Sequence, residues 1–552
     1  MKGTNKKFAV ILIAFCTVAF WLAVLYLLQR LLMPKYQSGI VEGSMIEEYY
    51  RDKTEHDVVM IGDCELYENI STVELWRKYG ITSYIRGSAQ QLPWQSYYLL
   101  EDTLRCETPK TVVFNVLSLK YNEPQSEAYN RMTLDGMQWS SAKFNAIRAS
   151  MTGSEKMEDY LFPLLRYHSR WTELTEEDFR CMFSKDFVTC NGYYLRADVR
   201  PEDEFPDPMP LADYTLGENA MHYLKQMDRL CKEKGITLVL VKAPVLYPHW
   251  YDEWNQQIVD YAEKNGLAYL NFIGLRDEIG LDMSTDTYDA GLHLNVYGAE
   301  KLADYFGAWL AENCDLPDHR SDSEIASYYT SLEERYDNEK NKQLAELEEK
   351  GELVSHSAAA INETKETNTM KKLIVFALVA VLCLGLVACS SEKDSGKNSV
   401  VGNDTSVAET DGTYKMVFRE TEIVLGADMQ SVLDKLGEPK KYFESESCAF
   451  KGLDKVYTYD GVVIRTYPKD KKDYILNVEL RDDTVSTPEG ISIGDSKAKV
   501  TEVYGAETTS NDTSVSYQKG DVVLAFIINA EGNVTSITYT LTSQAGAGSS
   551  AQ

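Results

Sequence analysis

"VVMIGDC", residues 58–64, contains the two features that decide the fold of the first half of the chain. Its four leading apolar residues predict a short buried strand, and Gly62 with Asp63 predicts a sharp turn at the carboxyl end of that strand. A helix can begin after such a turn, with Cys64 at its amino terminus. A cysteine there is either a nucleophile, because the helix end stabilises its thiolate, or a small buried residue.

Two more runs rich in β-branched residues, 111–114 and 237–241, have the same character. The helix expected over residues 219–234 has one apolar face, and Gly235 is suited to end it. Strands that alternate with helices predict an α/β fold, with a parallel sheet covered on both faces in residues 34–315. In such sheets the active residues collect at the carboxyl ends of the strands.

Residues 123–213 interrupt this alternation and are rich in aromatic side chains, so we expect an inserted cap. Its rings either pack a small satellite core or form a platform for sugar rings at the mouth of the site.

The composition and the amino-terminal segment predict the compartment. A formal charge of -29 argues against nucleic acid or anionic lipid as a partner, because both repel an acidic protein. Residues 8–28 carry no charge and follow a basic start, so residues 1–33 are expected to anchor the chain in the cell membrane. The positive-inside rule then places the main domains outside the cytoplasm.

A second apolar segment lies in mid-chain, after residues 316–369, where we expect a charged helix and a polar linker. Residues 370–389 combine two lysines, a short apolar run and "LVAC", which resembles the lipobox of bacterial lipoproteins. That resemblance implies lipidation at Cys389, followed by a linker over 390–412. Such a signal in mid-chain indicates either two neighbouring reading frames joined together or a genuine fusion with an internal membrane dip.

The last part of the chain, residues 413–544, contains an internal repeat. Its first unit has Gly426, Val432 and Gly437, and its second has Gly494, Val500 and Gly505 at identical spacings. The pattern resembles the tandem α+β repeats of bacterial lipoproteins related to β-lactamase-inhibitory protein, which implies a binding module.

If Cys64 is a nucleophile, a base must come from another loop, and three of the seven histidines remain as candidates: His168, His249 and His293. His293 lies in "DTYDAGLHLNVYG", just before an amphipathic helix, with Asp286 and Asp289 upstream. A carboxylate there can hold the imidazole in the tautomer that a base requires. We find no motif for a metal or a cofactor. A disulfide between Cys181 and Cys190, across a short loop, remains an open alternative.

"IGDC" after an early strand and "DAGLHLNVYG" before the last helix of the domain resemble the motifs of the SGNH/GDSL hydrolase superfamily, in its membrane-anchored branch that modifies envelope polymers. The resemblance covers residues 50–313 and implies a flavodoxin-like three-layer fold. It implies Cys64 as nucleophile, His293 as base and Asp289 as orienting acid.

The same resemblance implies oxyanion donors, namely the Cys64 backbone N–H, Gly87, and Asn115 or alternatively Asn122. Two departures stand out. Cysteine replaces the usual serine, and Ala290 occupies the usual place of the acid, so that Asp289 or Asp286 must substitute.

The resemblance therefore implies an O-acetyl transferase or esterase that acts on a cell-envelope polysaccharide, with a membrane-bound O-acyltransferase as its partner. The alternative is a catalytically inactive SGNH-like scaffold or binding protein of the envelope.

Overall fold

A computed structural model provides the structure. It describes residues 2–34, 45–52, 54–153, 155–172, 174–182, 187–202, 204–208, 210–211, 213–353, 413–446, 453–469, 472–510, 513–529 and 531–542. The lipobox segment 370–389 with Cys389, the linker 390–412 and most of the linker before the lipobox lie outside the described residues.

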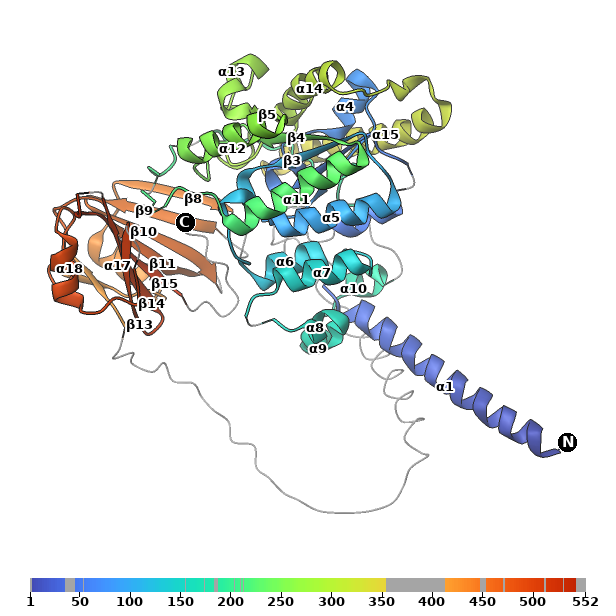
Figure 1. Ribbon diagram of the computed structural model, residues 1–552, viewed down its shortest axis with the longest axis horizontal. Coiled ribbons are helices and arrows are strands. Elements are labelled where there is room, and N and C mark those ends of the chain that lie inside the picture. Colours follow the sequence, from blue (N-terminus) through green and yellow to red (C-terminus); the bar gives the residue numbers. More distant parts are fainter. Residues whose placement is uncertain are drawn as a thin grey trace.

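Five parallel strands form the first sheet, in the order β2-β1-β3-β4-β5 (Figure 1). They are β1 Val58–Gly62, β2 Ser83–Gly87, β3 Thr111–Asn115, β4 Thr237–Lys242 and β5 Ala268–Asn271. The α/β prediction is confirmed, and the strand order is the flavodoxin-like one. Because the order reverses between β1 and β3, a crevice is expected where these two strands end. Cys64 follows β1, and Asn115 ends β3.

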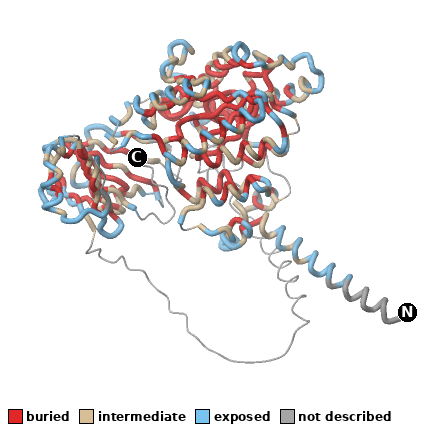
Figure 2. Tube along the Cα trace, in the orientation of Figure 1, coloured by how far each residue is buried: buried red, intermediate tan, exposed pale blue. Residues whose placement is uncertain are grey.

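Helices cover both faces of this sheet (Figure 1), and the centre of the domain is therefore buried, as the red part of the tube in Figure 2 shows. Alternate side chains of β1 enter two cores: Val58 and Met60 in one, Val59 and Ile61 in the other. The first core includes α4 Thr72–Tyr79, α14 Val296–Asn313 and α15 Ser323–Lys350, and the second α5 Pro93–Cys106, α11 Glu218–Lys234 and α12 Asp252–Asn265. Shorter elements connect them, namely α2 Met45–Glu48, η3 Tyr49–Arg51, α3 Cys64–Tyr67, η4 Leu117–Lys120, η6 Phe272–Leu275, α13 Arg276–Ile279 and η7 His319–Ser321.

The first helix, α1 Lys2–Leu32, contains one window, Phe15–Leu32, that is long and apolar enough to cross a membrane. Only 11% of that window is buried, so most of its apolar surface is left uncovered by the rest of the described chain. By length and composition the helix fits a membrane span or a signal sequence.

The inserted segment forms α6 Glu127–Leu134, α7 Ser141–Ser150, α8 Met157–Leu161, α9 Pro163–Tyr167, η5 His168–Thr172 and α10 Glu176–Cys181. Its rings do not form one satellite core. Tyr193 and Tyr194 belong to the main core, because they pack with the β1 and α15 side chains. Phe162 and Trp171, by contrast, are exposed.

The C-terminal domain is a separate antiparallel structure, in the order β12-β13-β14-β15-β11-β10-β9-β8, beside a β6-β7 pair. Its elements are β6 Met416–Phe418, β7 Thr421–Ile423, α17 Gln430–Leu436, β8 Lys441–Glu446, β9 Leu453–Tyr459, β10 Val462–Lys469, β11 Lys472–Leu480, α18 Lys497–Tyr504, β12 Thr509–Ser510, β13 Ser514–Lys519, β14 Val522–Ile528 and β15 Val534–Leu541. Val432 and Val500, which occupy equivalent places in the expected repeats, are both buried, on α17 and α18.

A small apolar cluster joins the two domains. Phe443 of β8 packs against Phe205 and Tyr247, with ring centroids 5.7 and 5.5 Å apart, and Leu292 belongs to the same cluster. Leu292 immediately precedes His293, so the C-terminal domain touches the loop that carries the candidate base.

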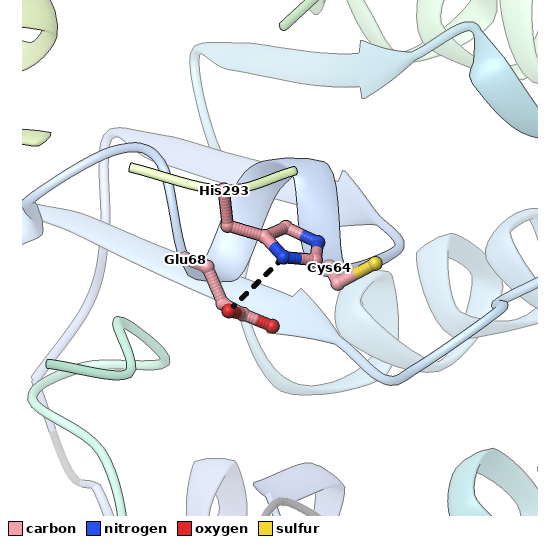
Figure 3. Close-up of side chains that lie close together, drawn as sticks. All are labelled: Cys64, Glu68 and His293. Carbon is pink, nitrogen blue, oxygen red and sulfur yellow. Dashed lines mark ion pairs between the residues drawn. The ribbon is translucent and has the colours of Figure 1, made fainter. Parts of the chain in front are cut away.

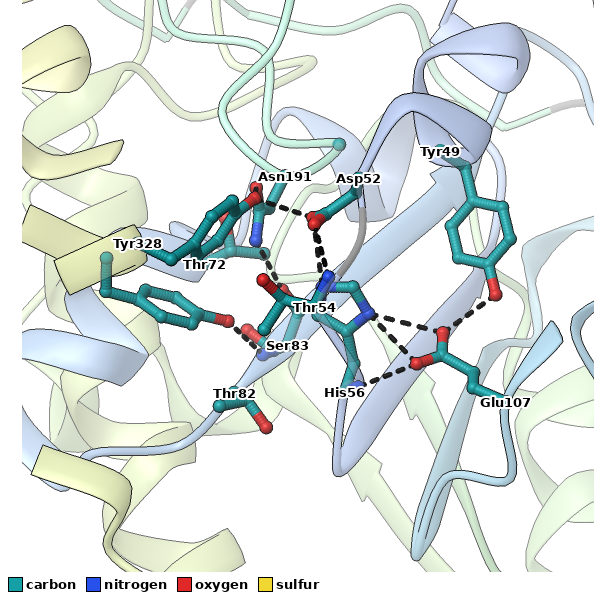
Figure 4. Close-up of polar contacts among 12 residues, drawn as sticks. Tyr49, Asp52, Thr54, His56, Thr72, Thr82, Ser83, Glu107, Asn191 and Tyr328 are labelled. Atoms are coloured by element: carbon teal, nitrogen blue, oxygen red, sulfur yellow. Dashed lines mark hydrogen bonds and ion pairs between the residues drawn. The ribbon is translucent and has the colours of Figure 1, made fainter. Parts of the chain in front are cut away.

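The amino ends of the strands are held by a buried ionic cluster around His56, shown in Figure 4. Its Nε2 lies 3.2 Å from Asp52 Oδ2, and its Nδ1 lies 3.2 Å from Glu107 Oε2. Tyr328 of α15 donates to Asp52 at 2.6 Å, and Tyr49 donates to Glu107 at 2.8 Å. The cluster therefore joins the chain before β1 to α5 and α15. Burial alone would lower the pKa of His56, but the two carboxylates raise it to about 9.

We predict that His56→Gln destabilises the protein in a pH-dependent way. A folded pKa of about 9 against about 6.5 in the unfolded chain corresponds to about 3 kcal/mol, fully present below pH 6.5 and lost as the pH rises through 9. Denaturant unfolding in detergent at pH 6 and pH 10 measures the difference. The exposed His222→Gln is the neutral control. An equal loss at both pH values would show that the charge of His56 contributes nothing.

Candidate functional site

Cys64 is the first residue of α3 and lies at the carboxyl end of β1. The Asp63 side chain caps the helix by accepting a hydrogen bond from the Glu65 backbone N–H at 3.2 Å. Gly62 is required by the close approach of neighbouring elements, because a Cβ there would lie 2.9 Å from Leu66 and 3.0 Å from Asn115. The strand, the glycine and the cap together hold the half-buried thiol at a helix amino terminus.

His293 faces Cys64 from the loop before α14, as Figure 3 shows. A ring nitrogen of His293 lies within 4.8 Å of the Cys64 Sγ atom. The other side of the ring is held by Asp289, whose Oδ2 lies 2.6 Å from Nδ1 and whose Oδ1 accepts from the His293 backbone N–H at 2.8 Å. Asp286 is engaged elsewhere, with Lys301 at 2.6 Å. Of the two candidate acids, Asp289 is therefore the one in contact with His293.

The backbone between Asp289 and His293 explains how an acid at position 289, one residue before its usual place, still reaches the His293 ring. Ala290 and Gly291 both have positive φ, 66° and 98°, so the loop curls and returns the Asp289 carboxylate to His293. Thr287 Oγ accepts from the Gly291 backbone N–H at 2.8 Å and donates to the His293 carbonyl at 2.7 Å, which fixes the curl.

Two residues of the site, Glu68 and Tyr288, were not predicted from the sequence. Glu68 Oε2 lies 3.6 Å from His293 Nδ1, and the Tyr288 hydroxyl donates to the same carboxylate. Glu68 stands one helical turn after Cys64, a spacing that places both side chains on one face and could have indicated it. No comparable signal pointed to Tyr288.

The ligand atoms of Cys64, Glu68 and His293 lie within 4.8 Å of one another. A thiolate, an imidazole and a carboxylate are the donors that zinc accepts, so these three residues could hold such an ion.

The charges of the site set its protonation at rest. Burial raises the pKa of the Cys64 thiol to about 11, although the charge of the nearby His293 acts against it. Burial would lower the pKa of His293, but Glu68 and Asp289 raise it well above its usual range. Both shifts favour a thiol beside an imidazolium, and the imidazolium must lose its proton before His293 can act as a base.

The two predicted oxyanion residues lie on the same sheet edge as Cys64. Gly87 ends β2, in register with Gly62. Asn115 ends β3, but its amide donates to Asp63 at 2.7 Å and to Glu65 at 3.3 Å. An oxyanion role for Gly87 and Asn115 therefore stays a prediction.

Behind Cys64 lies a buried ionic network. Lys242 at the end of β4 forms a 2.8 Å ion pair with Glu65. Burial and the charge of Glu65 raise the pKa of Asp63 to about 7, against the hydrogen bond from Asn115. The network fixes α3 to the ends of three strands.

The remaining candidates have other contacts. His168 is exposed and contacts the Leu165 carbonyl, and the His249 ring packs edge-on to Tyr251. Asn122 accepts from the Asn219 backbone N–H. Cys181 and Cys190, both in the described part of the chain, are not bonded to each other.

No family model and no curated protein matches the chain. Similar solved structures include a putative lipolytic protein of the G-D-S-L family from Desulfitobacterium hafniense DCB-2, at 13% identity and TM-score 0.22, covering 46% of this chain and 97% of that one. A GDSL-like lipase from Bacteroides thetaiotaomicron VPI-5482 has 14% identity and TM-score 0.23, covering 48% and 98%.

An extracellular protein containing a SCP domain from Bacillus anthracis str. Ames has 12% identity and TM-score 0.17, covering 26% of this chain and only half, 50%, of its own length. At these identities and TM-scores, the likenesses assign neither a family nor an activity to this chain.

We predict that Gly291→Ala disturbs the loop that holds His293. A Cβ there would lie 2.7 Å from Glu202 and 3.0 Å from Phe205, at a φ that alanine rarely adopts. The expected loss in unfolding free energy is about 1–2 kcal/mol. Gly274→Ala is the matched control, because nothing lies within 4 Å of its Cβ position. A Gly291→Ala variant as stable as the control would contradict the strained loop.

Proposed function

We propose that the protein is an esterase or acyltransferase that carries an acyl group, such as acetyl, on Cys64 as a thioester. The observation that supports this best is that a ring nitrogen of His293 lies within 4.8 Å of the Cys64 thiol while Asp289 holds the Nδ1 atom of the ring at 2.6 Å. This is the geometry of an activated nucleophile with an oriented base.

The steps follow from this geometry. Once His293 is neutral, Cys64 Sγ attacks the ester carbonyl carbon and its proton passes to the imidazole. The bond from carbon to the leaving oxygen then breaks, and His293 returns the proton to that oxygen. In the second half, an acceptor hydroxyl or water attacks the thioester with the same base, which regenerates the thiol.

The proposal includes a location outside the cytoplasm, with α1 as an uncleaved anchor and Cys389 as a lipidation site. The acceptor would be a cell-envelope polysaccharide, and the donor a membrane-bound O-acyltransferase. The position of the site relative to α1 supports a polymer as acceptor. The end of α1 shares a pocket with Tyr50 and Arg51, which precede β1, whereas Cys64 follows the other end of β1. The site therefore lies at the sheet edge opposite the proposed anchor, away from the membrane and toward a polymer outside it.

We predict that p-nitrophenyl acetate is hydrolysed by the full chain in detergent, and that Cys64→Ala abolishes the reaction. Asp289→Asn should lower kcat by at least about a hundredfold, because the base loses its orienting carboxylate. Asp286→Asn is the matched control and should retain most of the activity. If both aspartate variants behave alike, Asp289 is not the orienting acid. If wild type has no activity, the inactive-scaffold alternative gains support.

The two carboxylates beside His293 predict an alkaline pH dependence. The base is active when neutral, and Glu68 and Asp289 raise its pKa, so the hydrolysis rate should increase with pH above neutrality. Glu68→Gln removes one of these charges and should shift the rising limb toward lower pH. The exposed Glu312→Gln on α14 should leave the profile in place. A limb that moves to higher pH in Glu68→Gln would contradict the assignment.

A further inference from the structure

Four large apolar side chains are exposed together in the α8, α9 and η5 segment. Leu161 is 41% exposed, Phe162 59%, Leu165 55% and Trp171 65%. They flank the Phe162–Pro163 junction between two short helices, and we call them the α8–η5 apolar patch. Exposed apolar side chains are ordinary when scattered, but a group of four in eleven consecutive residues, 161–171, indicates a surface that binds something apolar.

The patch lies beside the end of α1. The α9 helix and η5 both contact α1, as the arrangement at the lower edge of the domain in Figure 1 also shows. Arg170 in η5 donates a hydrogen bond to the Leu32 carbonyl at 2.8 Å, and Leu31 and Leu32 are buried. The segment that exposes the patch therefore also contacts the last turn of α1.

The residue types of this segment suit a lipid surface. Its two arginines are held in ion pairs with acids on neighbouring elements, Arg166 with Glu127 at 2.7 Å and Arg170 with Asp178 at 3.0 Å, so the apolar side chains are the part that would enter the lipid. Aromatic side chains together with arginines are typical of the membrane–water interface. Half of the patch is leucine, which offers no flat ring on which a sugar could stack.

We propose that the α8–η5 apolar patch inserts into the interface of the lipid bilayer next to the point where α1 leaves it. This inference rests on the proposed role of α1 as a membrane span. Two attachments, one helix and one patch, would prevent the domain from swinging on its anchor. They would hold the amino ends of the strands near the membrane and the Cys64 edge away from it.

Site-specific photo-cross-linking of the full chain tests the proposal. The photoreactive residue p-benzoylphenylalanine replaces Phe162, Leu165, Val18 or Val199, one at a time, and the protein is reconstituted into phosphatidylcholine–phosphatidylglycerol vesicles with a soluble chito-oligosaccharide present. Val18 lies in the span and is 59% exposed, and Val199 is a 48% exposed valine near the site loop. Mass spectrometry identifies the adduct.

The expected result is a lipid adduct at positions 18, 162 and 165, severalfold above the yield at position 199. A lipid adduct at 18 without one at 162 or 165 would overturn the patch while leaving the anchor intact. An oligosaccharide adduct at 162 in place of lipid would assign the patch to glycan and overturn the proposal. No lipid adduct at 18 would remove the anchor and the inference with it, whereas the Cys64 chemistry would stand.

Discussion

The hydrogen bond between Asp289 and His293 is the interaction on which the candidate site depends. It fixes the imidazole with Nδ1 toward the carboxylate, in a position where a ring nitrogen lies within 4.8 Å of the Cys64 thiol. The bond exists because the curl at Ala290 and Gly291 shortens the path from the acid to the ring. On the opposite side of the ring, the strand, Gly62 and the Asp63 cap place the thiol. The loop that places His293 and the turn that places Cys64 are both needed to bring the imidazole and the thiol together.

The carboxylates that hold the His293 ring in place also favour its protonated form. Glu68 and Asp289 both favour imidazolium, and burial disfavours the Cys64 thiolate. Both effects favour the protonated forms, and a thiol is a weaker nucleophile than a thiolate.

The sequence predicted the parts of the fold that depend on local pattern. The strands at 58–61, 111–114 and 237–241 and the helix that ends at Gly235 agree with β1, β3, β4 and α11 because hydrophobic period and glycine caps are local signals. The pairing of Cys64 with His293 came from a family resemblance, since no local pattern joins residues so far apart. Glu68, Tyr288 and the Phe443 contact between domains depend on tertiary packing, and the main-core position of Tyr193 had no signal in the sequence.

The most direct test of the central claim is the identity of the acylated atom. The full chain is mixed with p-nitrophenyl acetate, quenched in acid within the first turnover and digested, and the peptides are mapped by mass spectrometry. The Cys64–His293–Asp289 site predicts one acetyl group on the Cys64 peptide that neutral hydroxylamine removes, as a thioester requires. Release of nitrophenol with the acetyl group on another side chain, or with Cys64 unmodified, would contradict it.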